Sequence, residues 1–283
     1  MFAILQIANR SALSLRLCKR HYSVRIGCAS GFWGDTAVST PQLLYGTPKV
    51  NYIVYDYLSE ITMALLARMK ARDAKSGFCP DFIAFHMAPH IQQIKKKGIK
   101  IISNAGGLNP AACAEALRTA AKAKGVEDLR VGVVTGDDIL SCKDKYLETA
   151  RLESGVDKSA LSSQRKWASM NAYFGAGPIA KALDMGADVV ITGRCTDSSI
   201  VLGPLMHEFK WKHDEWDKLA TGSLAGHLIE CGAQVTGGIF TDWQSTSKTW
   251  YVREFFAVLL NCWTFSCLFY GRYRFPHRRI QCR

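Results

Sequence analysis

Polar residues and glycines follow several apolar runs of the chain, each at the point where a run ends. In Ile101–Pro110 (IISNAGGLNP), Asn104 ends a short apolar run, Gly106 and Gly107 follow, and Asn109 precedes a proline. In an open α/β sheet, the carboxyl ends of the strands are where ligands bind. We therefore expect a ligand site at this edge of the predicted sheet.

The candidate site gathers the residues that end five such runs. They are Gly31, Gly34 and Asp35 after the first run, Asp56 and Glu60 after the second, Asn104, Gly106, Gly107 and Asn109 after the third, Asp137 and Asp138 after the fourth, and Gly193, Arg194 and Asp197 after the fifth. Carboxylates, amides, an arginine and backbone N–H groups together suit a polar or anionic ligand. Asp56, Asp137 and Asp138 are the candidate catalytic acids and bases, and burial would have to raise a carboxyl pKa toward working pH.

Several of these residues also have a structural interpretation. Asn109 has the sequence position of a helix cap. Asp137 and Asp138 form either a site for a hard cation or a solvated turn, and no third ligand is defined, so no metal is assigned. Arg194 either binds an anionic group with two hydrogen bonds or forms a buried ion pair with Asp197.

A further set of reactive side chains lies in Gly226–Gly238 (GHLIECGAQVTGG). On a helix, His227 and Cys231 lie on the same face, with Glu230 beside them. One interpretation is a cysteine nucleophile activated by histidine. The other is a helix end that docks on the sheet edge. Gln234 is included among the candidate ligand-binding residues.

Two other patterns carry less chemistry. His86 and His90 have the spacing of a helical metal pair, but Pro89 lies between them and no acidic third ligand is near. The glycines in Gly27–Gly34 have the spacing G-x3-G-x2-G, which is not the dinucleotide fingerprint G-x-G-x-x-G. A nicotinamide-dependent oxidoreductase is therefore the least favoured class of enzyme, and no cofactor is assigned.

Strand-like and helix-like segments alternate along the chain. Strands are expected at residues 24–30, 50–55, 100–103, 130–135 and 188–192, and helices at 59–72, 81–97, 110–124, 178–185, 198–209 and 221–231. Residues 141–168 are charged and weakly periodic, and are interpreted as an excursion or flap. Apolar strands that alternate with helices predict an α/β fold with a mainly parallel β-sheet flanked by helices on both faces.

The positive charge of the chain is concentrated at its ends. Of the net charge of +12, +4 falls on residues 1–22, +5 on residues 249–283, and +3 on the long segment between them. A nearly neutral centre does not support a nucleic-acid-binding face. The ten cysteines include no C-x-x-C pair, and reduced thiols are expected in a chain of this size.

The two ends of the chain are expected to lie outside the main domain, residues 23–242. Residues 1–22 are rich in Arg, Ser and Leu and lack acids, as in a mitochondrial transit peptide, with a secretory signal and a disordered tail as alternatives. The expected location is the mitochondrial matrix. In residues 243–283, the apolar run Phe255–Tyr270 is shorter than the ~20 residues of a membrane helix. No membrane span is expected, and this tail is not assigned to the fold.

Seven segments, in this order along the chain, resemble the acyclic terpene utilisation protein AtuA family. They are GFWGD (31–35), YDYLSEITMALLAR (55–68), SNAGGLNP (103–110), VTGDD (134–138), NAY (171–173), ADVVITGRCTDSS (187–199) and GHLIECGAQVTGG (226–238). The resemblance covers about Arg25–Asp242. Cys28 stands where the family tends to have glycine. The resemblance implies an α/β domain and a role in the breakdown of acyclic isoprenoids through acyl-CoA intermediates.

Two functions follow from the site and the resemblance together. The first is an enzyme, a lyase or hydratase, that acts on a small organic acid or an acyl-CoA thioester. Arg194 and the loop Asn104–Asn109 would then hold the anionic group. The second is a non-catalytic ligand-binding or scaffold subunit of an acyl-CoA carboxylase-type complex. A homo-oligomer is compatible with either function.

Overall fold

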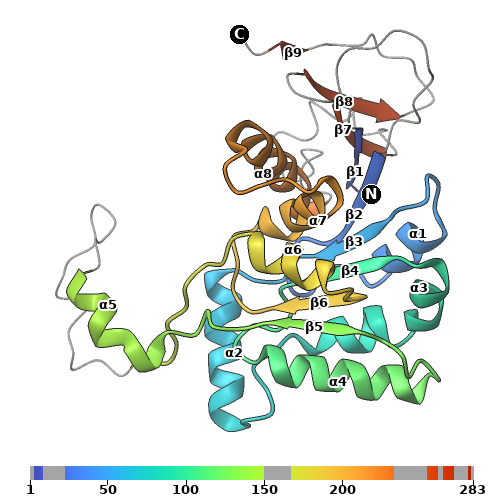
Figure 1. Cartoon of the computed structure of the whole chain (residues 1–283). Helices are drawn as coiled ribbons and strands as arrows, with labels where there is room; N and C mark the ends of the chain where they lie inside the picture. The colour runs from blue at the N-terminus through green and yellow to red at the C-terminus, as the bar shows by residue number, and fades with distance from the viewer. Residues whose placement is uncertain are drawn as a thin grey trace, which may run out of the picture.

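Five short apolar segments form the all-parallel part of one sheet. They are β2 (Ser23–Ser30), β3 (Tyr52–Tyr55), β4 (Lys100–Ser103), β5 (Val131–Val134) and β6 (Val189–Thr192). In this computed structural model, the structure describes residues 23–149 and 167–232, and the backbone of strands at 3–8, 254–260, 264–270 and 280–281. The five strands lie in the order β5-β6-β4-β3-β2, and every neighbouring pair is parallel (Figure 1).

Helices cover both faces of this sheet, as the alternation of segments predicts. One face carries α1 (Ser39–Tyr45), α2 (Glu60–Arg72), the π-helix η1 (Phe82–Met87), α3 (Ile91–Lys97) and α4 (Pro110–Ala123), and the other carries α6 (Gly177–Asp184), α7 (Ser199–Phe209) and α8 (Trp216–Glu230) (Figure 1). In β3, Ile53 and Tyr55 belong to the core under the first set of helices. Tyr52 and Val54 belong to the core under the second set. The α/β fold class is confirmed.

Local signals explain where several helices begin. The Ser59 hydroxyl accepts the N–H of Thr62, and the Thr62 hydroxyl accepts the N–H of Ser59, so a capping box starts α2. Asn109 caps α4, whose first residue is Pro110. Both starts agree with the sequence prediction.

The helical stretch expected over residues 81–97 is divided into two helices. The segment forms the π-helix η1 and then α3, because Pro89 has no N–H and cannot continue a regular helix. Ala88 donates its N–H to Ile83, five residues back, and α3 begins at Ile91. Helix α8 also begins at Trp216, five residues before the expected start.

Further strands extend the sheet beyond β2. Strand β1 (Ala3–Ala8) pairs antiparallel with β2, and β7 (Glu254–Leu260) pairs parallel with β1. Strands β8 (Thr264–Tyr270) and β9 (Ile280–Gln281) follow as antiparallel neighbours. These strands fall in the segments interpreted as leader and tail, and that division of the chain stays a prediction.

The segment after β5 leaves the sheet. A short 3-10 helix, η2 (Leu140–Cys142), leads into α5 (Lys143–Thr149), which Figure 1 shows standing away from the body of the molecule. This part of the predicted excursion is therefore not core, and residues 150–166 lie outside the described residues. Within the described part of the chain, no helix combines the length and the apolar character needed to cross a membrane.

The loops after β4 and β6 leave the sheet toward opposite faces. The chain passes from β4 into α4 on one face, and from β6 into α7 on the other. These strands are neighbours, so their carboxyl ends form a topological switch point, the place where open α/β sheets bind ligands.

Candidate active site

Asp56 and Asn104 occupy the centre of the carboxyl edge. The backbone N–H of Asp56 donates to Ser30 at the end of β2, which fixes its position after β3. Asn104 Nδ2 donates to Asp56 Oδ1 at 2.6 Å, and its Oδ1 accepts the N–H of Tyr57 at 2.8 Å. The other oxygen of Asp56, Oδ2, is buried and receives no hydrogen bond from a described protein donor.

The surroundings of Asp56 favour its protonated form. Burial raises the pKa of Asp56 well above its ordinary value, and the hydrogen bond from Asn104 offsets only part of this effect. The negative charges of Asp197 and Glu230 raise this pKa further, while Arg194 lowers it. Asp56 therefore has the environment of a general acid or base.

Arg194 is paired within the protein. Its Nη1 lies 2.7 Å from Asp197 Oδ1 and donates to the carbonyl of Cys195, and its Nη2 lies 3.8 Å from Glu60 Oε1. The guanidinium lies 4.1 Å from the centre of the Tyr173 ring, and the side chain is buried. The ion pair considered from sequence is present. The anion-binding role of Arg194 stays a prediction.

The two neighbouring aspartates at 137 and 138 have different surroundings. Asp137 is buried, and its Oδ2 accepts the backbone N–H of Arg194 and the amide of Asn171, both at 2.9 Å. A Cβ at Gly193 would collide with this carboxylate. Burial raises the pKa of Asp137, and the two hydrogen bonds oppose the rise. Asp138 is exposed and accepts an N–H within its own turn, so Asp137 supports the loop that carries Arg194 while Asp138 faces solvent.

The glycine-containing loop after β4 packs closely against neighbouring segments. A Cβ at Gly106 would lie 2.5 Å from the carbonyl oxygen of Thr192, so the loop lies directly against the end of β6. Gly107 has φ +52°. Asn109 accepts the N–H of Ala112 and donates its amide to two carbonyls of the loop after α2. The helix-cap interpretation of Asn109 is confirmed, and a ligand contact from this loop stays a prediction.

The loop after β2 receives the end of α8. Asp35 accepts the N–H groups of Gly31 and Thr36, which closes the turn, and Gly34 adopts φ +103°. A Cβ at Gly31 would lie 2.6 Å from the carbonyl of Cys231. The docking of α8 therefore depends on a glycine at position 31.

The geometry of α8 agrees with docking better than with a cysteine nucleophile. His227 is exposed, and its Nδ1 lies 3.5 Å from Glu230 Oε1. Burial, together with the hydrogen bond and negative charge of Glu230, raises the pKa of the Cys231 thiol to about 12. A nucleophilic cysteine needs the opposite shift. Gln234 lies outside the described residues.

His86 is a core residue. Its Nδ1 lies 2.7 Å from Thr40 Oγ1, and its ring meets Tyr55 edge to face at 5.2 Å. Burial lowers the pKa of His86 to about 4. Among the described residues, no group of three or more His, Cys, Asp or Glu side chains is arranged to hold a metal ion.

The family model of the acyclic terpene utilisation family protein AtuA matches residues 24–255. The chain belongs to the AtuA family. Neither the curated proteins nor the solved structures include a significant match to it. The match spans the whole carboxyl edge of the sheet, from the loop after β2 to the end of α8.

Three side chains complete this edge in the AtuA-family chain but were not assigned a role from sequence. They are Asn171, Tyr173 and Glu230. Asn171 and Tyr173 belong to the NAY segment, so a signal was present for two of them. Glu230 was visible only as a neighbour of His227 and Cys231, because its approach to Asp56 depends on tertiary packing.

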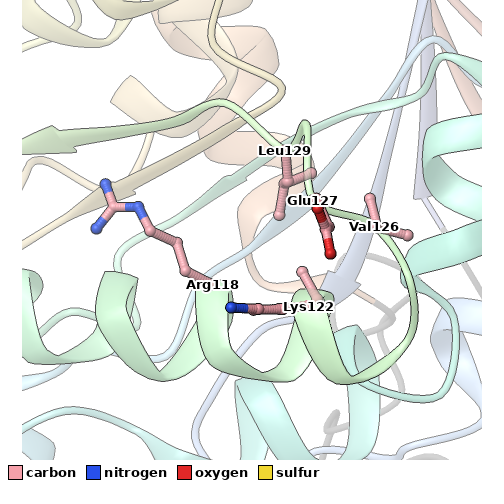
Figure 2. Close-up of a pocket in the computed structure, with 6 residues that line it drawn as sticks. Arg118, Lys122, Val126, Glu127 and Leu129 are labelled. Atoms are coloured by element: carbon pink, nitrogen blue, oxygen red, sulfur yellow. The ribbon is translucent and has the colours of Figure 1, made fainter.

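A cavity of about 300 Å³ lies at the opposite edge of the AtuA domain. Figure 2 shows its lining, which comes from the end of α4 and the segment before β5: Arg118, Ala121, Lys122, Val126, Glu127 and Leu129. In a parallel sheet this position is at the amino ends of the strands. The cavity is therefore separate from the polar groups at the carboxyl edge.

Proposed function

We propose that this AtuA-family chain is an enzyme of acyclic terpene utilisation that transfers a proton to or from carbon, as a hydratase or lyase. The substrate is an acyclic isoprenoid chain carried as a free acid or acyl-CoA thioester. One observation carries the proposal: Asp56 is a buried carboxyl with a raised pKa, held by Asn104 at the carboxyl edge of the sheet.

The chemistry needs only a proton donor and water. In hydration, the proton of Asp56 forms a bond to one alkene carbon and the electron pair of the double bond is used for that bond. Water oxygen bonds to the second carbon, and a proton of that water returns to the Asp56 carboxylate. Elimination is the reverse. Positive charge develops on the second carbon as the proton is added and is neutralised when the water oxygen bonds there.

The substrate's anionic group is assigned to Arg194, as the sequence suggested. The carboxylate of Glu60 is exposed and lies 3.8 Å from Nη2, whereas the Asp197 carboxylate is 2.7 Å from Nη1. An incoming carboxylate would therefore replace Glu60 and leave the closer pair intact.

Turnover in deuterated water tests this function. The purified chain is incubated with a panel of acyclic isoprenoid acids and their CoA thioesters, and the products are analysed by mass spectrometry. We expect addition of one deuterium and one hydroxyl, or the reverse elimination. Asp56→Asn should lower kcat by 10² or more, a typical loss for a general acid. Asp128→Asn, at an exposed carboxyl of the opposite edge, should have little effect.

Binding without turnover would contradict the enzymatic proposal. Stabilisation by a panel member, with neither product nor deuterium exchange, is the result expected of a non-catalytic subunit. Co-purification of a carboxylase-type complex with such an inactive chain would then identify that role.

We also propose that residues 1–22 direct the chain to the mitochondrial matrix. Their basic, acid-free composition supports this location. A reporter fused to residues 1–30 should be imported into isolated mitochondria and shortened, and replacing Arg10, Arg16 and Arg20 with Glu should prevent import. A reporter that stays outside would contradict the proposal.

A further inference from the structure

Two buried carboxyl groups meet at the carboxyl edge of the sheet. Asp56 comes from the end of β3, and Glu230 is the last residue of α8. Both residues are at most 4% exposed. The negative charge of Glu230 raises the pKa of Asp56, and a hydrogen bond from Asp56 lowers the pKa of Glu230. Asp56 Oδ2 is buried and receives no hydrogen bond from a described protein donor. A proton on either carboxyl would provide the donor that this contact requires.

The packing of α8 holds Glu230 in this position. The Cys28 thiol of β2 donates to the carbonyl of Glu230 at 3.1 Å, although the two residues are 202 positions apart. A Cβ at Gly31 would lie 2.6 Å from the next residue of the chain, Cys231. A Cβ at Gly226, one turn earlier, would lie 2.6 Å from the carbonyl of Ser198. Backbone packing on two sides therefore fixes the end of α8, which carries Glu230, beside the carboxyl edge of the sheet.

The charges around the two carboxyls do not allow both to ionise. The cation that lowers the pKa of Asp56 is Arg194, and its guanidinium is already paired with Asp197. The negative charge of Asp197 raises the pKa of both Asp56 and Glu230. The hydrogen bond from the Cys231 thiol lowers the pKa of Glu230, and the charge of His227 lowers it less, because the His227 side chain is 75% exposed. Two adjacent carboxylates in such a site retain one proton between them.

We propose that Asp56 and Glu230 share one proton as an acid–carboxylate pair, with Glu230 as the positioning residue that keeps Asp56 protonated at neutral pH. The shared proton is a property of the folded chain and does not depend on any substrate. Its use in catalysis rests on the proposed hydratase or lyase function. Substrate approach to Asp56 would break the carboxyl–carboxyl hydrogen bond and leave the proton on the residue that donates it.

Infrared spectroscopy of the full chain tests the pair directly. At neutral pH we expect one protonated-carboxyl C=O band, which Asp56→Asn removes. Glu230→Gln should also remove it, because a glutamine amide can donate to Asp56 and allow that carboxyl to ionise. Asp138→Asn, which changes an exposed carboxylate, should leave the band unchanged. Absence of the band in the wild-type chain, or its persistence in Glu230→Gln, would overturn the proposal.

Proton release on unfolding, compared between the wild-type chain and Asp56→Asn, provides a second measurement. The pair binds one proton in the folded chain at neutral pH, and unfolded carboxyls bind none. Other groups, such as His86, contribute equally to both chains. Unfolding at pH 7 should therefore release about one proton more from the wild-type chain, and its stability should fall as pH rises through the raised pKa. Equal release from the two chains would contradict the pair.

Measurements of activity distinguish the shared proton of Asp56 and Glu230 from the proposed hydratase or lyase reaction. If the band is present and no isoprenoid substrate is turned over, the pair stands and the hydratase or lyase function is wrong. If turnover occurs, Glu230→Gln should shift the pH profile of kcat/KM to lower pH, whereas a purely structural role would lower activity equally at every pH.

Discussion

At the residue scale, the buried aspartates Asp56 and Asp137 have different roles because their hydrogen-bond partners differ. Asp137 is buried but accepts two hydrogen bonds, so it is a fixed support for the Arg194 backbone. Asp56 accepts one strong hydrogen bond and has a second oxygen without a donor, so it is the carboxyl available for proton transfer. The sequence placed both at strand ends but had no means of ranking them, because hydrogen-bond partners come from other segments.

Cys231 provides a prediction at this scale. Because its thiol pKa is raised to about 12, alkylation by iodoacetamide at pH 7 should be slower than that of a free cysteine by on the order of 10² to 10³. Mass spectrometry of the modified peptides measures the rate, with the exposed Cys142 as the comparison within the same chain. Rapid alkylation of Cys231, or loss of turnover in Cys231→Ala, would restore the nucleophile interpretation.

At the scale of elements, local signals determined more of the fold than of the site. Strand β4 has the bounds expected from its apolar run, and the Ser59 and Asn109 caps start α2 and α4 as predicted. These features depend on residues close in sequence. The insertion of β6 between β4 and β5 depends on contacts between distant segments and was not predicted. Docking of the end of α8 on the sheet edge was one of two interpretations of the sequence, but its position beside β2 also depends on such contacts.

Gly31→Ala tests the docking of α8. The added methyl group would contact the backbone of Cys231 at 2.6 Å, so α8 must move, and we expect a loss of about 1–3 kcal/mol in the free energy of unfolding. The matched control is Gly175→Ala, where a Cβ meets no atom within 4 Å; it should change stability by less than about 0.5 kcal/mol. Chemical denaturation measures both. Equal stability of the two variants would contradict the docking model.

At the scale of the whole molecule, the acidic side chains at the two edges of the sheet have different surroundings. The carboxyl edge holds acids with raised pKa values, whereas the amino edge holds Asp188 between cations. Lys95 and Lys100 lie 2.9 Å and 2.8 Å from its carboxylate. Desolvation raises the pKa of Asp188, but the hydrogen bonds from these lysines outweigh it and lower the pKa to about 2.

This arrangement predicts acid-dependent stability. A carboxyl whose pKa is lowered by folding stabilises the protein above its unfolded pKa of about 4, and the stabilisation is lost as pH falls toward about 2. Asp188→Asn should therefore lower the free energy of unfolding by about 1–2 kcal/mol at neutral pH and have a smaller effect near pH 2. Asp128→Asn, at an exposed partner of Lys95, should cost less than about 0.5 kcal/mol. A pH-independent effect of Asp188→Asn would contradict this explanation.

The pH profile of kcat/KM for hydration, measured for the wild-type chain and for Asp56→Asn, tests the central claim most directly. Wild-type activity should fall as pH rises through the raised pKa of Asp56, because the proton donor is lost. The variant should keep only a low activity without this limb, while Asp128→Asn, at an exposed carboxyl of the opposite edge, should reproduce the wild-type profile. An unchanged limb in Asp56→Asn would show that another group supplies the proton.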